Sequence, residues 1–506
     1  MNKLLLILCL FTYQFAYAEQ QEVELLSIEP SDIELARSEL PITVTDALQK
    51  AGVPADNVSI YVQALAEQPT KLNPPILTHL SSLALNPAST MKLLTSYASL
   101  SLLGPAYRWK TEVYSDGILN NGVLNGNLYV KGYGDPNFMT ADFWRLLNSL
   151  RQLGVKEIKG DLVIDNSYFA TNLQSTESFD GEPLRAYNAQ PSAFSINLKA
   201  SSFKFDSDAN QVTITQEPNL PEIKIVNLLK VNNLKPENSQ TVSAQCSVWR
   251  NTLGYDVKSV ENTAIVTFNG TYAPNCKDKY LELLAIDENN YTLYLFRKLW
   301  TELGGSFNGK LLTKNVPIDA KKLIQQDAKT LAQILPEMNK WSNNLMARQL
   351  LLTLAAESAT VDNIDVSATQ DNGAIAVERW LKSIGLHFDE LVIENGSGLS
   401  RIERISAEHM GQMLVNAYYS PVMPELMSSL PILAVDGTML KRMKDSNLKG
   451  RAHLKTGSIN GAFTLAGYVL GSEGQRYVVV FMANHPNAAL TKPAQDALLE
   501  WVILQP

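Results

Sequence analysis

Two side chains near residue 90 have the types and spacing of a catalytic pair. Ser89 and Lys92 stand three positions apart, and on a helix that spacing puts both on one face, where Lys92 reaches the Ser89 hydroxyl. A serine hydroxyl is a poor nucleophile until a base takes its proton. A lysine can be that base only where burial or a second cation lowers its pKa. The pair therefore predicts a serine nucleophile with a lysine general base.

Two later runs add polar groups in chain order. Ser342 and Asn344 offer a hydroxyl to relay a proton and an amide to hold a substrate amide. The run Lys455-Thr456-Gly457-Ser458 offers a cation and two hydroxyls for a carboxylate, and Gly457 lets a substrate backbone lie close. Each run alone is a weak signal, since Ser201-Ser202-Phe203-Lys204 repeats the first spacing in a β-rich context. All three in order form a specific signature of acyl transfer.

The surrounding patterns predict which elements carry these residues. Apolar residues at helical spacing predict a helix over 87–103, which Gly104-Pro105 ends. Short β-like runs with Gly and Asn turns follow from 107 to 280, and 200–276 reads as a small β domain. Later patterning predicts helices at 328–358, 404–419 and 491–503 and strands at 463–470 and 477–483. The order predicts an α/β (α+β) domain interrupted by β-rich insertions.

Charge and the first residues limit the compartment and the partners. The formal charge is 43 − 51 = −8, which excludes the basic footprint of a nucleic-acid-binding protein. Lys3, the apolar run from Leu4 to Phe11 and Ala16-Tyr17-Ala18 predict a signal peptide over 1–18 and export to the periplasm. That run is too short to span a bilayer, which takes about 20 residues. The final helix, with Trp501, allows no more than weak peripheral membrane contact.

The cysteines fit an exported chain. Cys9 lies in the signal segment, and Cys246 and Cys276 remain. In an oxidising compartment an even count favours a disulfide over two free thiols. The sequence has no His/Cys group at zinc spacing, so no structural metal is expected.

The chain resembles the class C low-molecular-mass penicillin-binding proteins, the D-alanyl-D-alanine carboxypeptidase/endopeptidases of the penicillin-binding protein 4 type. Lys92 and Ser342 enclose 249 residues (93 to 341), which is room for whole inserted domains. Asn395 stands where that family usually has Asp. Further matching blocks are Pro87-Ala88-Ser89, Leu103-Gly104-Pro105, Gly134-Asp135-Pro136, Pro191-Ser192-Ala193, Asn395-Gly396-Ser397-Gly398-Leu399-Ser400 and Asp436-Gly437-Thr438.

The resemblance implies a fold with nested domains. A serine penicillin-recognising transpeptidase-like domain, with an antiparallel sheet and helices, is expected at 19–105 and 320–506 and is called the main domain below. Insertion domain II is expected at 106–192 and 278–319. Insertion domain III, rich in β structure, is expected at 193–277.

The resemblance also implies a mechanism. Neutral Lys92 takes the Ser89 proton, Ser89 attacks the carbonyl between two D-alanines, and an acyl-enzyme forms. Backbone N–H groups of Ser89 and Ser458 form the oxyanion hole, a contribution of ~3–4 kcal/mol per donor in comparable sites. Ser342 passes a proton to the leaving amine, and water completes the hydrolysis.

The substrates implied are peptidoglycan stem peptides and cross-bridges, with β-lactam antibiotics as acylating ligands. Asn344 would hold the acyl side-chain amide. Lys455, Thr456 and Ser458 would bind the terminal carboxylate beside Gly457. No cofactor is required.

Two alternatives stay open. A serine β-lactamase would share Ser89 and Lys92 but needs an acid to speed deacylation, and the nearby candidate is Glu357. A non-catalytic cell-wall scaffold on the same fold would not need the three motifs together. Glu182 falls where relatives place an acid that reads the free amino group of the stem peptide, which makes it a candidate for the same role.

Overall fold

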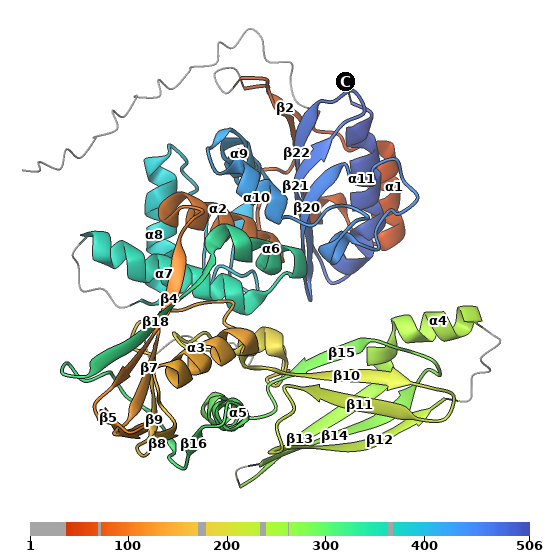
Figure 1. The fold of residues 1–506 in the computed structure, drawn as a ribbon. Helices are drawn as coiled ribbons and strands as arrows, with labels where there is room; N and C mark the ends of the chain where they lie inside the picture. The colour runs from red at the N-terminus through yellow and green to blue at the C-terminus, as the bar shows by residue number, and fades with distance from the viewer. Residues whose placement is uncertain are drawn as a thin grey trace, which may run out of the picture.

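The computed structural model describes residues 37–68, 72–170, 179–232, 239–261, 263–362 and 368–505. The expected signal peptide lies outside these ranges. Within them, no helix is long and apolar enough to cross a membrane. Figure 1 shows three bodies: the main domain, domain II beside it, and domain III extending from domain II as an arm.

The main domain is built on a five-stranded antiparallel sheet. Its order is β2 (Pro75–His79), β1 (Val58–Ala64), β22 (Arg476–Asn484), β21 (Ala462–Leu470) and β20 (Ala452–Ile459). The two expected strands near the C-terminus are β21 and β22, which pair along their whole length. Helices cover both faces, so the central strands are apolar on both sides.

The two faces carry different helices. Helices α1 (Ile42–Ala51) and α11 (Lys492–Ile503) pack with Ile60, Val479 and Phe481 on one face. Helices α2 (Met91–Leu103) and α9 (Ala407–Tyr419) pack with Tyr61, Val478 and Val480 on the other. Adjacent strand residues thus enter opposite cores, as the two-residue period of a strand requires.

The helical layer of the main domain holds four further helices, which are α6 (Leu331–Trp341), α7 (Asn344–Asp362), α8 (Gln370–Ser383) and α10 (Met423–Ser429). Thr330 begins α6 with a capping box to Gln333. The helix expected over 328–358 is in fact two helices, because Ser342 ends α6 in the left-handed region, with φ of 59° and ψ of 42°.

Domain II surrounds two helices with two sheets. One sheet has the order β17 (Leu311–Thr313), β9 (Leu162–Asp165), β7 (Leu128–Gly132), β4 (Arg108–Ser115) and β18 (Lys321–Thr330). The other has the order β16 (Ser306–Phe307), β8 (Glu157–Ile158), β6 (Val123–Asn125) and β5 (Ile118–Asn120). The helices are α3 (Thr140–Gln152) and α5 (Glu288–Glu302). Short β-like runs were expected from 107 to 280, but this segment also contains α3, which buries Phe143, Leu146, Leu147 and Leu150 at helical spacing.

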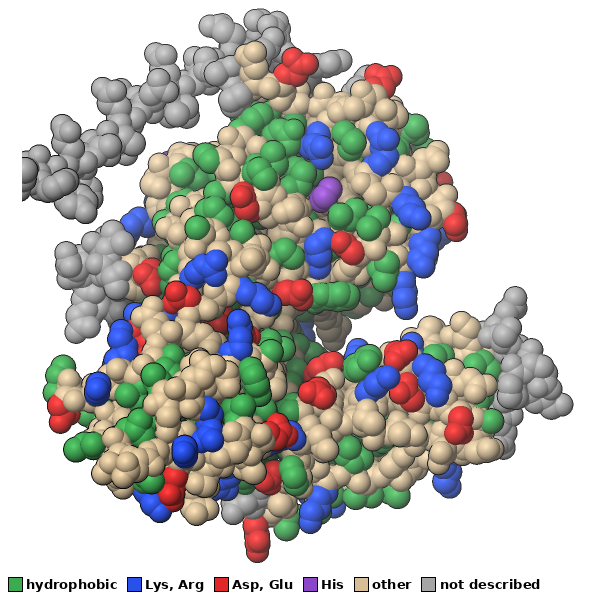
Figure 2. Space-filling view, in the orientation of Figure 1, with side chains coloured by type: hydrophobic (Ala, Val, Ile, Leu, Met, Phe, Trp, Pro, Cys, Tyr) green, Lys and Arg blue, Asp and Glu red, His purple; other side chains and the backbone are tan. Residues whose placement is uncertain are grey.

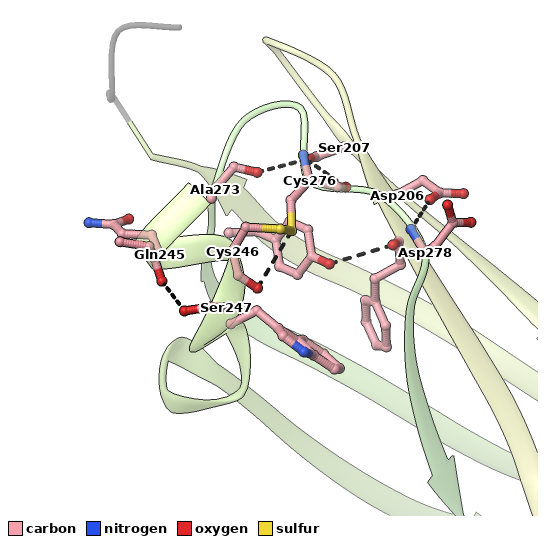
Figure 3. The surroundings of a disulfide bond; sticks show 12 residues. Asp206, Ser207, Gln245, Cys246, Ser247, Ala273, Cys276 and Asp278 are labelled. Carbon is pink, nitrogen blue, oxygen red and sulfur yellow. Dashed lines mark hydrogen bonds between the residues drawn. A yellow bond between two sulfur atoms is a disulfide. The ribbon is translucent and has the colours of Figure 1, made fainter. Parts of the chain in front are cut away.

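Domain III consists of two three-stranded sheets and a short helix. The strands are β11 (Val212–Glu217), β10 (Ser201–Ser207) and β15 (Lys279–Leu283) in one sheet, and β12 (Ile223–Val231), β14 (Thr263–Tyr272) and β13 (Leu253–Val260) in the other. Helix α4 (Ser239–Ser247) carries Cys246, which forms a disulfide with Cys276 across a Cα–Cα distance of 5.7 Å (Figure 3). The disulfide ties α4 to the loop before β15.

Sheet pairing bears on where the domains begin and end. Strand β18 pairs with β4, and β15 pairs with β10. We therefore extend the proposed domain II to Thr330 and the proposed domain III to Leu283.

In the space-filling view an open notch separates the arm of domain III from the main domain (Figure 2).

Candidate active site

Ser89 lies in a tight turn that leads into α2. The turn is a 3₁₀ helix, Ala88–Thr90, and Ala88 has a φ of 44°, which is rare for a residue other than glycine. Asn86 Oδ1 accepts a hydrogen bond from the Ala88 backbone at 2.9 Å. The Thr90 hydroxyl donates to Pro87 O at 2.6 Å. These bonds hold the serine at the start of the helix, half-buried.

Lys92 is fully buried beneath that serine. Its Nζ donates to Ser89 Oγ at 3.0 Å, to Asn344 Oδ1 at 2.8 Å and to the backbone carbonyl of Ser397. Burial lowers the pKa of Lys92 to about 7, and the charge of Glu403 acts in the opposite direction. A substantial fraction of the amine is therefore unprotonated near neutral pH, which is the state a general base needs.

Lys455 and Ser342 form a second buried pair. Lys455 Nζ donates to Ser342 Oγ at 2.8 Å and to the Thr456 carbonyl at 2.7 Å. Burial and then the charge of Lys92 hold the pKa of Lys455 well below its usual range. The left-handed turn that ends α6 is what points Ser342 toward β20.

Strand β20 is the edge of the main sheet at the site. A bridge from Ile432 to His453 covers its outer side, and Leu454 N donates to Pro431 O. Beyond Leu454 the strand carries Lys455, Thr456, Gly457 and Ser458 along an edge that no other described strand joins. An edge strand presents backbone groups to which another extended chain can pair.

Gly457 allows β20 to lie against the nucleophile turn. A Cβ on Gly457 would stand 2.2 Å from Thr464 Oγ1, 2.8 Å from Pro87 O and 2.8 Å from Ser89 N. No side chain fits there. The Thr456 hydroxyl donates to the hydroxyl of Thr438, which lies 2.9 Å away on the neighbouring turn. Thr438 thus adds a third hydroxyl beside Thr456 and Ser458, although in the sequence it stands out only as part of a matching block.

Asn344 connects Lys92 to domain II. Its Oδ1 accepts from Lys92, and its Nδ2 donates to the backbone carbonyl of Tyr187 at 3.4 Å. Tyr187 lies in a 3₁₀ turn, Ala186–Asn188, of domain II. A segment far from the motifs in sequence therefore reaches the site.

The same domain II segment holds Glu182. Its Oε2 accepts from the Tyr255 hydroxyl of β13 at 3.0 Å, so Glu182 links domain II to domain III. Near it, Phe179 lies under the guanidinium of Arg401, 4.4 Å from the ring centre. These contacts put a carboxylate and a guanidinium at the border between the main domain and the insertions.

The turn of residues 395–398, which belongs to one of the matching blocks of the sequence, contacts the site directly. Its Ser397 carbonyl accepts from Lys92, while Asn395 Oδ1 accepts from the Ser397 backbone at 3.0 Å and from its hydroxyl at 2.6 Å. A Cβ on Gly398 would stand 1.9 Å from Ala88 O. The glycines around Ser397 were the available signal, because close approach of two backbones demands them.

Other candidates have different surroundings. The Glu357 carboxylate accepts from the phenols of Tyr107 at 2.9 Å and Tyr168 at 2.5 Å. Lys204 of the second S-x-x-K run lies on β10 and pairs with Asp206 and Asp278. Among the described residues, no group of three His, Cys, Asp or Glu could hold a metal ion.

Comparisons with known proteins find relatives of this chain. The D-alanyl-D-alanine carboxypeptidase DacB of Haemophilus influenzae is 27% identical over 399 residues, which cover 78% of this chain and 80% of that protein. A D-alanyl-D-alanine carboxypeptidase of Actinomadura sp. is 28% identical over 421 residues, which cover 81% of this chain and 76% of that protein.

A solved structure shares the fold. The crystal structure of penicillin binding protein 4 (dacB) from Haemophilus influenzae superposes with a TM-score of 0.70 at 25% sequence identity, covering 90% of this chain and 99% of that one. The expected α/β architecture, with an antiparallel sheet, helices and inserted β-rich domains, is thereby confirmed. The model of the D-Ala-D-Ala carboxypeptidase 3 (S13) family matches residues 40–503, and the chain belongs to that family.

Proposed function

We propose that this carboxypeptidase is exported to the periplasm and works through an acyl-enzyme on Ser89. We further propose that it cleaves peptidoglycan cross-bridges as well as stem peptides, and that penicillins acylate it. One observation carries the proposal, which is the buried Lys92 amine at 3.0 Å from the Ser89 hydroxyl. That contact couples a nucleophile to a base of suitable pKa.

The acylation step follows from this contact. Lys92 Nζ takes the hydroxyl proton as Ser89 Oγ bonds to the carbonyl carbon between two D-alanines. The backbone N–H groups of Ser89 and Ser458 stabilise the oxyanion, and the C–N bond then breaks. Ser342, whose hydroxyl accepts a hydrogen bond from Lys455 Nζ, passes a proton to the leaving amine. Water then attacks the ester and regenerates Ser89.

The free edge of β20 supports a mode of substrate binding. An extended D-Ala-D-Ala peptide pairs with the edge beyond Leu454, with its terminal carboxylate beside Thr456 and Ser458. Lys455 is fully buried beneath the strand, and it acts on the site through its hydrogen bond to Ser342 Oγ. Asn344 holds the acyl side-chain amide through its Nδ2 group.

Cross-bridge cleavage needs the same chemistry with a larger leaving group. In that reaction the leaving amine belongs to the D-centre of a cross-linking diamino acid. The edge of β20 beyond Leu454, which no other described strand joins, supports this proposal, because a branched polymer needs an open surface along which to lie. Glu182 lies in the segment beside the site and is the proposed contact for a free amino group of the stem peptide.

Penicillin acylation is supported by a solved relative. A penicillin binding protein 4 (dacB) structure from Haemophilus influenzae, described as complexed with a novel β-lactam, superposes with a TM-score of 0.67 at 25% identity. A β-lactam carries a strained amide in place of the D-Ala-D-Ala bond. The same Ser89 attack would open it and leave an acyl-enzyme.

The first test follows the intact mass of the mature protein with labelled penicillin, with Ser89→Ala as control. A lasting adduct on the wild type alone supports a slowly deacylating penicillin-binding enzyme. An adduct that vanishes while penicillin is consumed supports a serine β-lactamase instead. No adduct, with no D-alanine released from a pentapeptide, leaves the non-catalytic scaffold.

The finer claims need separate measurements. Release of D-alanine from a pentapeptide and of monomers from cross-linked dimers, compared on one preparation, tests the two peptidase activities. N-terminal sequencing of the exported protein tests cleavage after Ala18. A Glu182→Gln variant should raise KM for substrates with a free amino group and leave KM unchanged for their acetylated forms.

A further inference from the structure

A buried acid lies behind the proposed general base. Glu403, just before β19 (Ile405–Ser406), is fully buried. Its Oε1 accepts from the backbone amides of Asn395 at 3.0 Å, Gly396 at 2.9 Å and Glu394 at 3.3 Å. Three N–H groups converging on one carboxylate oxygen hold a charged acceptor in a single orientation. The carboxylate thereby fixes the start of the turn.

The turn connects this carboxylate to Lys92. Ser397 directly follows the amides that Glu403 binds, and the Ser397 carbonyl accepts from Lys92 Nζ. The Thr95 hydroxyl donates to the Gly396 carbonyl at 2.6 Å and ties the turn to α2, the helix that carries Lys92. Burial raises the pKa of Glu403, while the backbone amides of Asn395 and Gly396 and the charge of Lys92 act in the opposite direction. The charge of Glu403 in turn favours the ammonium form of Lys92.

We propose that Glu403 is a positioning residue for Lys92, which presents the Ser397 carbonyl to the amine and sets the pH at which the amine becomes free. The proposal rests on the proposed acylation of Ser89. The charge of Glu403 stabilises the ammonium form of Lys92, which otherwise faces the buried Lys455. Without this acid the site would hold two buried lysines with less compensating charge.

Three other charged groups surround Glu403 and Lys92. Lys455 approaches Lys92 from β20. Glu394, at the start of the turn, faces Glu403 and also Arg348 of α7. Glu394 is half-buried, and its side chain acts on Glu403 rather than on the amine. A change at Glu394 is therefore a matched control for a change at Glu403.

The test measures the second-order rate of penicillin acylation from pH 5 to pH 9, together with the melting temperature of each protein. Glu403→Gln keeps an oxygen acceptor and removes the charge. The acid limb of the rate profile is the pH range in which the rate falls because the Lys92 amine becomes protonated. Loss of the Glu403 charge disfavours the ammonium form of Lys92, so this acid limb should move to lower pH by about one unit. The plateau should fall about tenfold as the turn loosens, a part of what a positioned base contributes.

Two further variants separate charge from position. Glu403→Asp keeps the charge but is one methylene shorter, so its acid limb should stay at the wild-type pH while its plateau falls. Glu394→Gln should leave both the limb and the plateau unchanged. If Glu403→Gln does not fold, the Glu403→Asp plateau still decides the positioning role.

Each result bears on one part of the proposal. A Glu403→Gln limb that coincides with the wild-type limb overturns the charge role, and an unchanged plateau overturns the positioning role. A Glu403→Asp limb that moves, or an Asp plateau that equals that of the wild type, also contradicts the proposal. Failure of the wild type itself to be acylated would instead refute the proposed function.

Discussion

Replacing Gly457 with alanine should slow the enzyme while leaving its fold intact. The added Cβ would stand 2.2 Å from Thr464 Oγ1 and 2.8 Å from both Pro87 O and Ser89 N. Contact between such atoms needs about 3.4 Å, so β20 must shift by about 0.6 Å from the nucleophile turn and the Thr464 side chain must move by about 1.2 Å. Misplacement of about 1 Å at a reacting centre costs roughly 100-fold in rate, so this shift of β20 should cost roughly tenfold or more. The shift should also cost about 1–3 kcal/mol in unfolding free energy, as overpacking does.

The assay for this prediction is the second-order rate of penicillin acylation, read beside the melting temperature. Gly471→Ala is a control, because it adds a methyl group after the far end of β21. A double variant with Thr464→Ala removes the nearest contact but leaves the backbone atoms of Pro87 and Ser89 at 2.8 Å. The double variant should therefore recover only part of the rate. A Gly457→Ala protein with the wild-type rate would refute the close approach of β20 to Ser89.

Three further predictions follow from the site and the arm. Acylation of the wild type should fall as pH drops through about 7, because the Lys92 amine becomes protonated there, and a rate profile that stays flat to pH 5 would contradict it. Asn344→Asp places a carboxylate against Lys92 Nζ, now 2.8 Å from the amide oxygen, so the acid limb should move up by about one unit or more; a limb at or below the wild-type pH would refute this. Replacing Cys246 and Cys276 together with serine opens a loop of sequence separation 30, which should cost ~3–4 kcal/mol of unfolding free energy in denaturant titration. The double serine variant should keep the wild-type acylation rate, and a lost rate would mean that the arm shapes the site.

The sequence was most informative where chemistry is local. Ser89 and Lys92 share one helix face, and Lys455 to Ser458 share one strand, so a short pattern reports each group directly. The helix over 328–358 was harder, since its apolar spacing continues through Ser342 and nothing in that pattern shows the left-handed residue that splits it. Here the backbone conformation, and not hydrophobicity, decides the geometry of the site.

Contacts made by backbone atoms leave no pattern in the amino-acid sequence from which they could be predicted. The Ser397 carbonyl binds Lys92, yet a carbonyl is present at every residue, so only the tight fit of Gly398 marks the turn. Glu403 stands between Ile402 and Arg404, in a polar run that is typical of a solvated loop. Its complete burial depends on packing between segments far apart in the chain, which single-sequence periodicity cannot report.

The position of the insertions explains how so large an addition leaves the site intact. The chain leaves the main domain near Tyr107 and returns at Leu331, and these two points are bonded to each other: Leu331 N donates to Tyr107 O at 2.8 Å, and Ala332 N donates to Pro105 O at 3.1 Å. The chain therefore leaves and re-enters the main domain at two adjacent points, so the length of the insertion from 108 to 330 costs the main domain little. Within that insertion the segment through Tyr187 folds back to Asn344. The segment that follows Tyr187 also contacts α7, since Arg348 Nη1 donates to Ala189 O at 2.8 Å and Gln349 Nε2 donates to Ser192 O at 3.0 Å. The inserted domains therefore reach the site along α7, while Ser89 and Lys92 belong to the main domain.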